Sequence, residues 1–425
     1  MGDHELSIGA GGSLVIEDGG QLICNNSVAA TVKKKIEAPT PAASKDGDVY
    51  GWYTISSPVY TGTDAYSKKY VTIGAETTVN LPTGSYDMFA YDEAAQMWRT
   101  QKNENATGFD KMYQGQGYIY RNSGNELSFV GNTNVGEIDY HQTITKTGTG
   151  DLAGFNLIGN PYTHSITKGS GKAIYNANFS EGFYVLEDDA WVTYSDGDEI
   201  KANQGILIKT SADVENFQIK DVKYVAPAKS NGDNIKFIVS NGQSQDVAYA
   251  LFDKGIGLDK INHRSPDVPM LYINQDGQDY AIATMSDDTK TFNLNFKAGK
   301  MGKYTLSFNA NDHFNYLHLI DLLTGEDVDM LLEKEYSFIA TPNDKDNRFI
   351  VKLGYNAANN ANNDIFAYQN GNDIVVEGEG ELQVFDVTGR QVKTQRINGV
   401  QTINLNTQGV YIFKLNDKVQ KVVVR

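Results

Sequence analysis

The segment "GVYIFKLNDKVQKVVVR" (residues 409–425) consists of two runs of strand-forming residues on either side of a short polar reversal. β-Branched and aromatic side chains dominate both runs, which favours strand over helix. Alternation along the first run predicts two distinct faces: Tyr411, Phe413 and Leu415 on one, Val410 and Ile412 on the other. Because chain ends usually fray, so strong a pattern at a terminus indicates that this hairpin either packs against the protein or is recognised by a partner.

The residues before this hairpin continue the strand pattern. "DIVVEG", "ELQVFDV", "QVKTQRI" and "VQTINL" are predicted strands, and "DVTG" has Asp386 and Gly389 at the first and last positions of a type I turn. A sandwich of about 60 residues has a marginal core, so the last strand is expected to complete it. The low-complexity run "NAANNANND" (residues 356–364) is typical of a linker. We therefore predict a linker and a small C-terminal β-sandwich over residues 356–425.

The preceding segment, residues 223–355, contains runs such as "IKFIVS", "DVAYALF", "YAIATM" and "TFNLNF". Gly, Asn and Asp clusters separate these runs at a spacing typical of β-sandwiches. The sequence therefore predicts a β-sandwich module here. Within it, "DLLTGEDVDMLL" (residues 321–332) is expected to form a turn and a brief helical piece.

An internal repeat precedes this module. "GWYTISSPV" (residues 51–59) matches "GFNLIGNPY" (residues 154–162), and "GQGYIY" in the first copy matches "NQGILI" in the second. The matching positions keep their order while the segments between them shorten, as expected for a duplicated module whose loops vary. The sequence therefore predicts a first β-module over residues 37–150 and a second over residues 151–222.

Two shorter matching units stand nearer the start of the chain, "GGSLVI" (residues 11–16) and "GGQLIC" (residues 19–24). Short strands with Gly-Gly corners at a fixed step are typical of β-solenoid rungs, and about three rungs are usually needed for stability. We therefore expect either that further rungs precede these or that the two cap the next domain, and we assign residues 1–36 to them. Cys24, the only cysteine, is predicted to be a small buried apolar residue.

Together these patterns predict an all-β chain. It would consist of tandem β-sandwich modules, jelly-roll or immunoglobulin-like, with a β-solenoid remnant at the N-terminus and a small C-terminal sandwich. The net charge of −16 disfavours nucleic-acid partners, because it repels phosphate backbones. No apolar run approaches the ~18 residues of a membrane helix, so no transmembrane segment is expected. The first residues lack the basic and apolar regions of a signal peptide, which leaves either a cytosolic protein or an exported one shown without its signal peptide.

Three motifs near the C-terminus carry a resemblance to a known family. "VFDVTGRQV", "INLNTQGVYIFKL" and "KVQKVVVR", in this order, resemble the C-terminal sorting domain of type IX secretion substrates in the Bacteroidetes. The segment 362–373 lacks the Pro-Asn-Pro signature with which many members open this domain, so its start is left open. The sandwich before it and the two repeat units resemble modules of large Bacteroidales surface proteins.

This resemblance implies a route and a location. The type IX machinery would carry the protein through the outer membrane, a sorting peptidase would remove the C-terminal domain, and surface lipopolysaccharide would anchor the cargo. The implied sorting signal comprises Gly409, Val410, Tyr411, Lys421, Val422, Val423, Val424 and Arg425. The resemblance thus implies a secreted protein at the cell surface. This protein would be an adhesin or a structural stalk, and its ligand would be a glycan or a host protein. The alternative is that these are non-catalytic accessory modules of a secreted polysaccharide- or protein-degrading enzyme. Carbohydrate binding would be one of their roles.

The motifs of common catalytic sites are missing from the sequence. There is no H-E-x-x-H and no G-x-S-x-G, and "KGSGKA" (residues 168–173) lacks the remainder of a phosphate-binding loop. The protein is therefore predicted not to be an enzyme, and no cofactor is predicted. The histidines show no spacing typical of a metal site: His4, His141, His164, His263, His313 and His318.

Two further groups of residues are candidates for ligand binding. Carboxylate clusters leave structural calcium open, although solvated acidic turns explain them equally well at this net charge: Glu187–Asp189, Asp196–Glu199, Asp344 and Asp346. Trp98 and Trp191 occupy equivalent repeat positions, and Trp52 matches Phe155. Retention in both copies predicts that these aromatic rings belong to the core rather than to a sugar-stacking surface.

Overall fold

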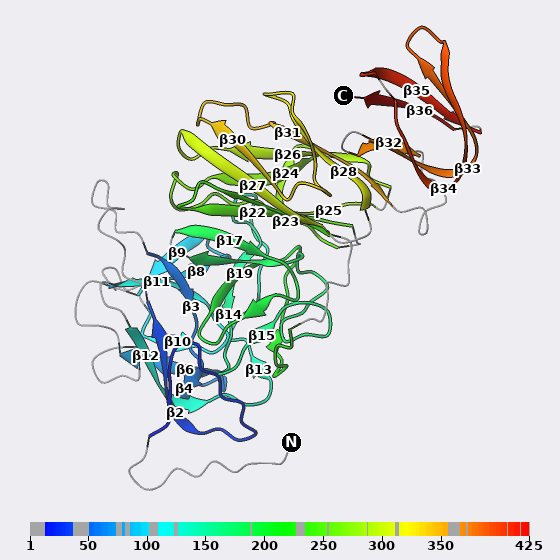
Figure 1. Cartoon of the computed structure of the whole chain (residues 1–425). Helices are drawn as coiled ribbons and strands as arrows, with labels where there is room; N and C mark the ends of the chain where they lie inside the picture. The colour runs from blue at the N-terminus through cyan, green and yellow to red at the C-terminus, as the bar shows by residue number, and fades with distance from the viewer. Residues whose placement is uncertain are drawn as a thin grey trace. The chain divides into compact units, whose positions relative to one another are not determined.

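The computed structural model describes residues 13–36, 51–73, 79–80, 86–101, 109–122, 126–187, 189–226, 234–252, 255–286, 288–310, 314–355, 366–370, 373–405, 407–416 and 418–424. All regular secondary structure in these ranges is β-strand (Figure 1). The prediction of an all-β chain built of several sheets is therefore confirmed. The brief helical piece expected in residues 321–332 is wrong, because this segment forms turns around the short strand β29 (Asp327–Asp329).

The chain divides into two compact units. The first comprises Met1–Ser286, Asn295–Leu306 and Ser337–Asp346. The second comprises Asp287–Leu294, Ser307–Tyr336 and Asn347–Arg425. Each unit is described below by itself.

The internal repeat in the first unit forms two four-stranded sheets with the same strand order. The first copy has the order β3 (Tyr53–Ile55), β11 (Tyr118–Asn122), β8 (Tyr86–Asp92) and β9 (Met97–Thr100). The second copy has the order β14 (Phe155–Gly159), β19 (Gly205–Lys209), β16 (Phe183–Glu187) and β17 (Ala190–Tyr194). All pairings in both sheets are antiparallel. The duplicated sequence thus corresponds to a duplicated sheet.

Smaller strand pairs follow the same duplication. In the first copy β6 (Lys69–Thr72) lies between β10 (Lys111–Tyr113) and β5 (Gly62–Thr63). In the second copy β15 (Ile166–Thr167) pairs with β18 (Glu199–Ile200). The buried pair Met112 and Val71 in the first copy corresponds to the buried pair Ile200 and Ile166 in the second.

The remaining strands of this region form two further sheets. One sheet has the order β1 (Val15–Ile16), β2 (Ala29–Lys35), β12 (Glu126–Thr133) and β4 (Val59–Tyr60), with β7 (Val79–Asn80) also paired to β12. The other consists of β13 (Ile138–Asp139) and β20 (Gln218–Ile219). Leu14 and Leu22 pack against the core of the first copy. Cys24 is partly exposed rather than buried, and its Sγ lies 3.5 Å from the Thr133 hydroxyl.

The two copies contact each other through equivalent positions. A Cβ at Gly205 would lie 2.7 Å from the Ile55 carbonyl oxygen, and a Cβ at the equivalent Gly117 would overlap the carbonyl of Ile158. The Gly117 N–H donates to the Leu157 carbonyl (3.0 Å). Only glycine permits this close approach of backbones, and it does so once in each direction. The contact that the second copy makes with the first is therefore repeated, at equivalent positions, by the contact that the first copy makes with the second.

A pair of buried carboxylates follows the same reciprocal pattern. Glu93, in the turn of the β8–β9 hairpin, accepts a hydrogen bond from the Gly154 N–H (2.7 Å). Asp189, in the turn of the β16–β17 hairpin, accepts one from the Gly51 N–H (3.1 Å). Both carboxylate residues are only 3% exposed. The hairpin turn of each copy thus binds the glycine that begins the other copy.

One hydrophobic cluster contains residues of three predicted segments. Trp52, Phe155 and Trp191 belong to it, together with Val247 and Tyr249 of the segment that follows the repeat. Trp52 is 6% exposed and Trp191 is 5% exposed, which confirms that these two rings belong to the core. Trp98 is half-buried, packs against the same cluster, and its ring centroid lies 4.9 Å from that of Tyr91.

The largest sheet has eleven strands. Its order is β29-β28-β31-β26-β24-β25-β22-β21-β27-β30, with β23 paired to β25. The bounds are β21 (Asn234–Ser240), β22 (Gln245–Leu251), β23 (Leu258–Asp259), β24 (Met270–Gln275), β25 (Gln278–Thr284), β26 (Thr291–Lys297), β27 (Gly302–Ala310), β28 (Phe314–Asp321), β30 (Glu335–Ala340) and β31 (Phe349–Tyr355). Alternating burial along β21 and β26 gives each strand one face toward the core.

The C-terminal residues of the second unit form a five-stranded sheet with its own core (Figure 1). Its order is β32 (Ala367–Asn370), β33 (Asp373–Asp386), β35 (Gly409–Leu415) and β36 (Lys418–Val424), with β34 (Gln391–Ile403) paired to β33. The core includes Val384, Phe413 and Leu382, all fully buried. This element contains most of the predicted sorting signal.

Candidate functional site

The two parts of the predicted sorting signal lie opposite each other in one β-hairpin, β35–β36. The antiparallel register pairs Gly409 with Val424, Val410 with Val423, Tyr411 with Val422, and Ile412 with Lys421. Arg425 lies outside the described residues. Two motifs that are separate in the sequence therefore form one continuous backbone ladder.

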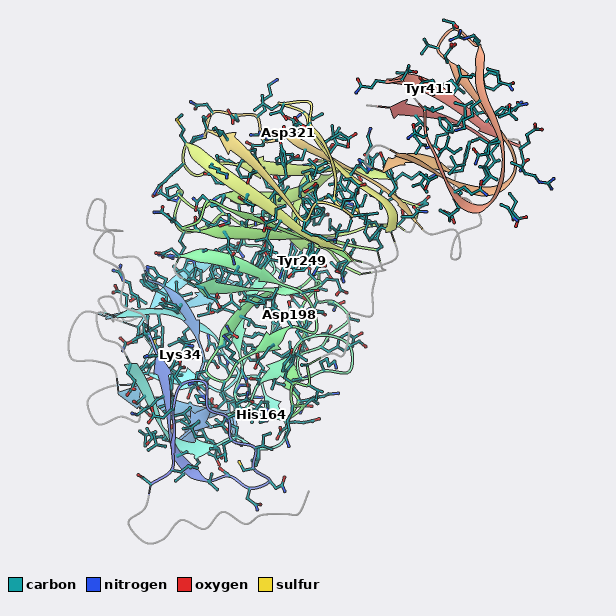
Figure 2. The ribbon with its side chains drawn as sticks, viewed as in Figure 1. Lys34, His164, Asp198, Tyr249, Asp321 and Tyr411 are labelled. Atoms are coloured by element: carbon teal, nitrogen blue, oxygen red, sulfur yellow. The ribbon has the colours of Figure 1, made fainter. Side chains whose placement is uncertain are left out.

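The alternation predicted for this hairpin is confirmed. Tyr411, Phe413 and Leu415 are buried, whereas Val410 and Ile412 are half-buried on the opposite face. The Tyr411 hydroxyl donates to the Thr407 carbonyl (2.9 Å) and lies 2.6 Å from the Thr407 hydroxyl. Tyr411, labelled in Figure 2, is thus held at both its ring and its hydroxyl.

The last strand also closes the sandwich against its first strand. The Gln420 Oε1 accepts hydrogen bonds from the N–H groups of Phe366 (2.7 Å) and Ala367 (3.0 Å). Its Nε2 donates to the Ala367 carbonyl (2.5 Å). A side-chain amide therefore supplies hydrogen bonds that a further strand would otherwise make. β36 completes the sandwich, as expected from the sequence.

The predicted turn at "DVTG" lies beside the hairpin. The Gly389 N–H donates to the Asp386 carbonyl (3.0 Å), as a type I turn requires. The hydrogen bond from the Thr388 hydroxyl (2.6 Å), with further bonds from the N–H groups of Arg390 and Thr388, lowers the pKa of Asp386 to about 2. The Asp386 carboxylate therefore stays ionised and holds this turn in one conformation.

A shallow, mostly apolar depression lies between the turn and the outer face of β35. Its volume is about 570 Å³, and its lining residues are Phe385, Asp386, Val387, Gly389, Val410 and Ile412. Val387 is 74% exposed at the rim of this depression. Of the predicted signal residues, Val410 lies in this depression, and Ile412 on the same face extends it. The neighbouring turn residues were not predicted as part of the site.

The carboxylates considered for calcium have protein partners. Asp196 pairs with the buried Lys168 Nζ (2.6 Å) and accepts from the Gly182 N–H (2.7 Å). The Tyr272 hydroxyl donates to Asp346 (3.0 Å). Among the described residues, no group of three or more His, Cys, Asp and Glu side chains is arranged to hold a metal ion.

The described histidines are held in separate places. His164, labelled in Figure 2, lies 2.9 Å from Asp221, and its ring stacks on Tyr162. His318 Nδ1 lies 2.6 Å from Asp327. His141 stacks on the Tyr113 ring, and His263 accepts a hydrogen bond from the Trp191 N–H (3.1 Å). His4 and His313 lie outside the described residues.

Sequence reasoning missed a buried ionic cluster in the first unit. Asp246 is 1% exposed and lies 2.5 Å from Lys260 Nζ and 3.4 Å from His263 Nε2. Its carboxylate also accepts hydrogen bonds from the N–H groups of Leu271 (2.6 Å) and Val247 (2.8 Å). Burial alone would raise the pKa of Asp246, but Lys260 and His263 lower it to about 2. Nothing in their spacing along the chain indicates that these residues meet.

Comparisons with known proteins identify no family. No protein-family model matches the chain, and no curated protein matches it. One solved structure, described as "Biofilm associated protein - BSP domain", aligns over 100% of this chain and 98% of its own, with 10% identity and a TM-score of 0.13. So low a TM-score carries no argument about fold or function. In the part of the chain that the structure describes, no helix is long and apolar enough to cross a membrane.

Proposed function

We propose that the C-terminal sandwich is an export address, read by type IX secretion machinery through the β35–β36 hairpin and the depression beside it. The observation that carries this proposal is the register that sets Gly409, Val410 and Tyr411 opposite residues 422–424. Two motifs resembling a sorting signal thus form a single recognisable element. The exposed Val387 and the half-buried Val410 and Ile412 add an apolar contact surface to it.

The remainder of the proposed route follows the family resemblance. A sorting peptidase would remove the C-terminal sandwich, and surface lipopolysaccharide would anchor the modules before it at the bacterial cell surface. There these modules would act without catalysis, as an adhesin or structural stalk with a glycan or host-protein ligand. The shared hydrophobic cluster around Trp52 and Trp191 supports a rigid supporting role, because it joins both repeat copies to the segment that follows them.

A secretion assay tests the export address. A fluorescent reporter with a signal peptide and residues 356–425 is expressed in a type IX-competent Bacteroidetes host and in a strain that lacks the system. We expect surface display in the first strain and periplasmic retention in the second. A matched reporter that ends at residue 408 should be retained in both strains, because it lacks the hairpin. Surface display of this shorter reporter would contradict the proposal.

The second candidate is an accessory role beside a degradative enzyme. No contact in the described residues favours it over the adhesin. The gene that encodes the full-length protein separates the two, since further repeat modules upstream favour the adhesin and a catalytic domain favours the accessory role.

A further inference from the structure

An exposed aromatic face on the first repeat copy is not part of the core. On the sheet β5–β6–β10, Tyr70 pairs directly with Tyr113, and their ring centroids lie 6.0 Å apart. The Tyr113 ring stacks on His141 with centroids 4.5 Å apart and planes 5° apart. All three side chains are half-buried, whereas Val71 and Met112 between them point into the core. Tyr70 and Tyr113 therefore lie side by side on the outer face of this sheet, edge to face, and the His141 ring covers one face of Tyr113.

A cation, Lys111, lies on this face close to Asp64 but forms no direct ion pair with it. The Lys111 Nζ lies 4.5 Å from the centre of the Tyr70 ring. Lys111 forms no ion pair with any carboxylate of the described residues, although the chain as a whole carries a net charge of −16. Asp64 accepts the hydrogen bond of the Tyr113 hydroxyl and interacts electrostatically with Lys111. The ammonium group thus remains available for an anion.

The second repeat copy serves as an internal comparison. The two strand pairs are aligned by their buried residues: Ile166 corresponds to Val71, and Ile200 to Met112. On the outer face, Ser165 therefore takes the place of Tyr70, Glu199 that of Lys111, and Lys201 that of Tyr113. In the second copy the Ser165 hydroxyl donates to Glu199 (2.6 Å). The same kind of strand pair therefore forms without aromatic rings, with a carboxylate in place of Lys111 and a lysine in place of Tyr113. The rings of the first copy are not needed to build the fold.

We propose that the outer face of β5–β6–β10 binds a carbohydrate that carries a carboxylate, of the hexuronic acid class. Aromatic rings on an exposed sheet offer flat apolar surfaces to the C–H face of a pyranose ring. Tyr70 and Tyr113 supply these surfaces, and Lys111 pairs with the carboxylate of the sugar. Burial lowers the pKa of His141 to about 4, so its imidazole is neutral at neutral pH and packs against the Tyr113 ring as an apolar group. This site deepens the adhesin role proposed above, but it does not depend on the export address.

Binding of defined oligosaccharides to the full chain tests this inference. The probes are a tetramer of galacturonic acid and the neutral tetramer of galactose, titrated by calorimetry at low ionic strength. We expect the acidic tetramer to bind at least tenfold more tightly than the neutral one, and its affinity to fall as salt is raised. Equal binding of the two probes, or no binding of the acidic one, would overturn the inference.

A triple variant provides the matched control. Tyr70→Ser, Lys111→Glu and Tyr113→Lys introduce the residues that the second copy carries at the equivalent positions, which that copy shows to be compatible with the sheet. Binding of the acidic tetramer should fall at least tenfold while the melting temperature stays within a few degrees. Unchanged binding in the triple variant would contradict the proposed site, whatever the outcome of the secretion assay.

Discussion

At the scale of single residues, Asp246 is the side chain whose replacement should cost most. It is fully buried beside Lys260, and removal of one partner leaves the other charge buried without compensation. We expect Asp246→Asn to lower the free energy of unfolding by about 3–5 kcal/mol. Chemical denaturation followed by tryptophan fluorescence measures this loss. The exposed Asp276→Asn is the matched control, expected to stay within about 0.5 kcal/mol of wild type.

Asp246 should also make the folding stability depend on pH in the acid range. Its pKa is about 2 in the folded protein, against 3.8 as the ordinary value, so the folded state favours the ionised carboxylate. A lowered folded pKa contributes stability above about pH 4, and this contribution is lost as the pH falls through about 2. We expect the denaturation midpoint of the wild type to fall over this range more steeply than that of Asp246→Asn. Parallel curves for the two proteins would contradict this assignment.

Some residues could be placed from the sequence and others could not. The burial of Tyr411, Phe413 and Leu415 follows from alternation, because a strand must turn every second side chain to the core. The contacts of Asp246 and Asp189 could not be foreseen, since their partners come from distant segments. Asp189 was considered as a calcium ligand, yet its carboxylate accepts the Gly51 N–H.

At the scale of elements, the closure of the C-terminal sandwich depends on one amide. Gln420→Ala removes the acceptor for the N–H groups of Phe366 and Ala367. We expect these two amides to exchange hydrogen at least tenfold faster in the variant, while the amides of β35 keep their protection. Hydrogen-exchange mass spectrometry of the full chain measures both segments at once. Equal protection of Phe366 and Ala367 in both proteins would contradict the proposed role of Gln420 in joining β36 to β32.

The hairpin turns that join the repeat copies give a second prediction at this scale. Glu93→Ala leaves the N–H groups of Gly154 and Thr147 without their acceptor, each at a cost of about 1–3 kcal/mol. Asp189→Asn keeps the left-handed backbone at this position tolerable but weakens the acceptor of the Gly51 N–H and the ion pair with Arg264, and it should cost less. Urea denaturation of both variants checks this order. If Glu93→Ala left the free energy of unfolding unchanged, the hydrogen bonds from each hairpin turn to the other copy would not be what holds the copies together.

The elements themselves were largely predictable. Strand runs, the turn at Asp386 and the duplication all leave local patterns of alternation, turn residues and repeated letters. The pairing of β15 with β18, or of β1 with β2 in parallel, leaves no such pattern, because these strands are only two residues long or pair across a distance in the sequence. The segment 321–332 was wrongly expected to include a helical piece, because it forms turns around the short strand β29.

At the scale of the whole molecule, we propose a division of roles between the C-terminal sandwich and the modules before it. Because the sandwich has its own hydrophobic core, we expect that it folds, and can be removed, without unfolding what precedes it. The repeat copies share a cluster with the following segment and form a single supporting body in the first unit. The boundaries drawn from the sequence at residues 36, 150, 222 and 355 stay predictions.

The most direct test places one charge in the proposed recognition surface of the full chain. Ile412→Asp introduces a carboxylate into the depression beside β35, whereas Val400→Asp places the same charge on an exposed position of β34 outside it. Both variants are expressed in a type IX-competent host, and the surface fraction is measured by protease accessibility of intact cells. The account predicts at least a tenfold loss of surface protein for Ile412→Asp and wild-type display for Val400→Asp. Wild-type display of Ile412→Asp, with the sandwich folded, would contradict it.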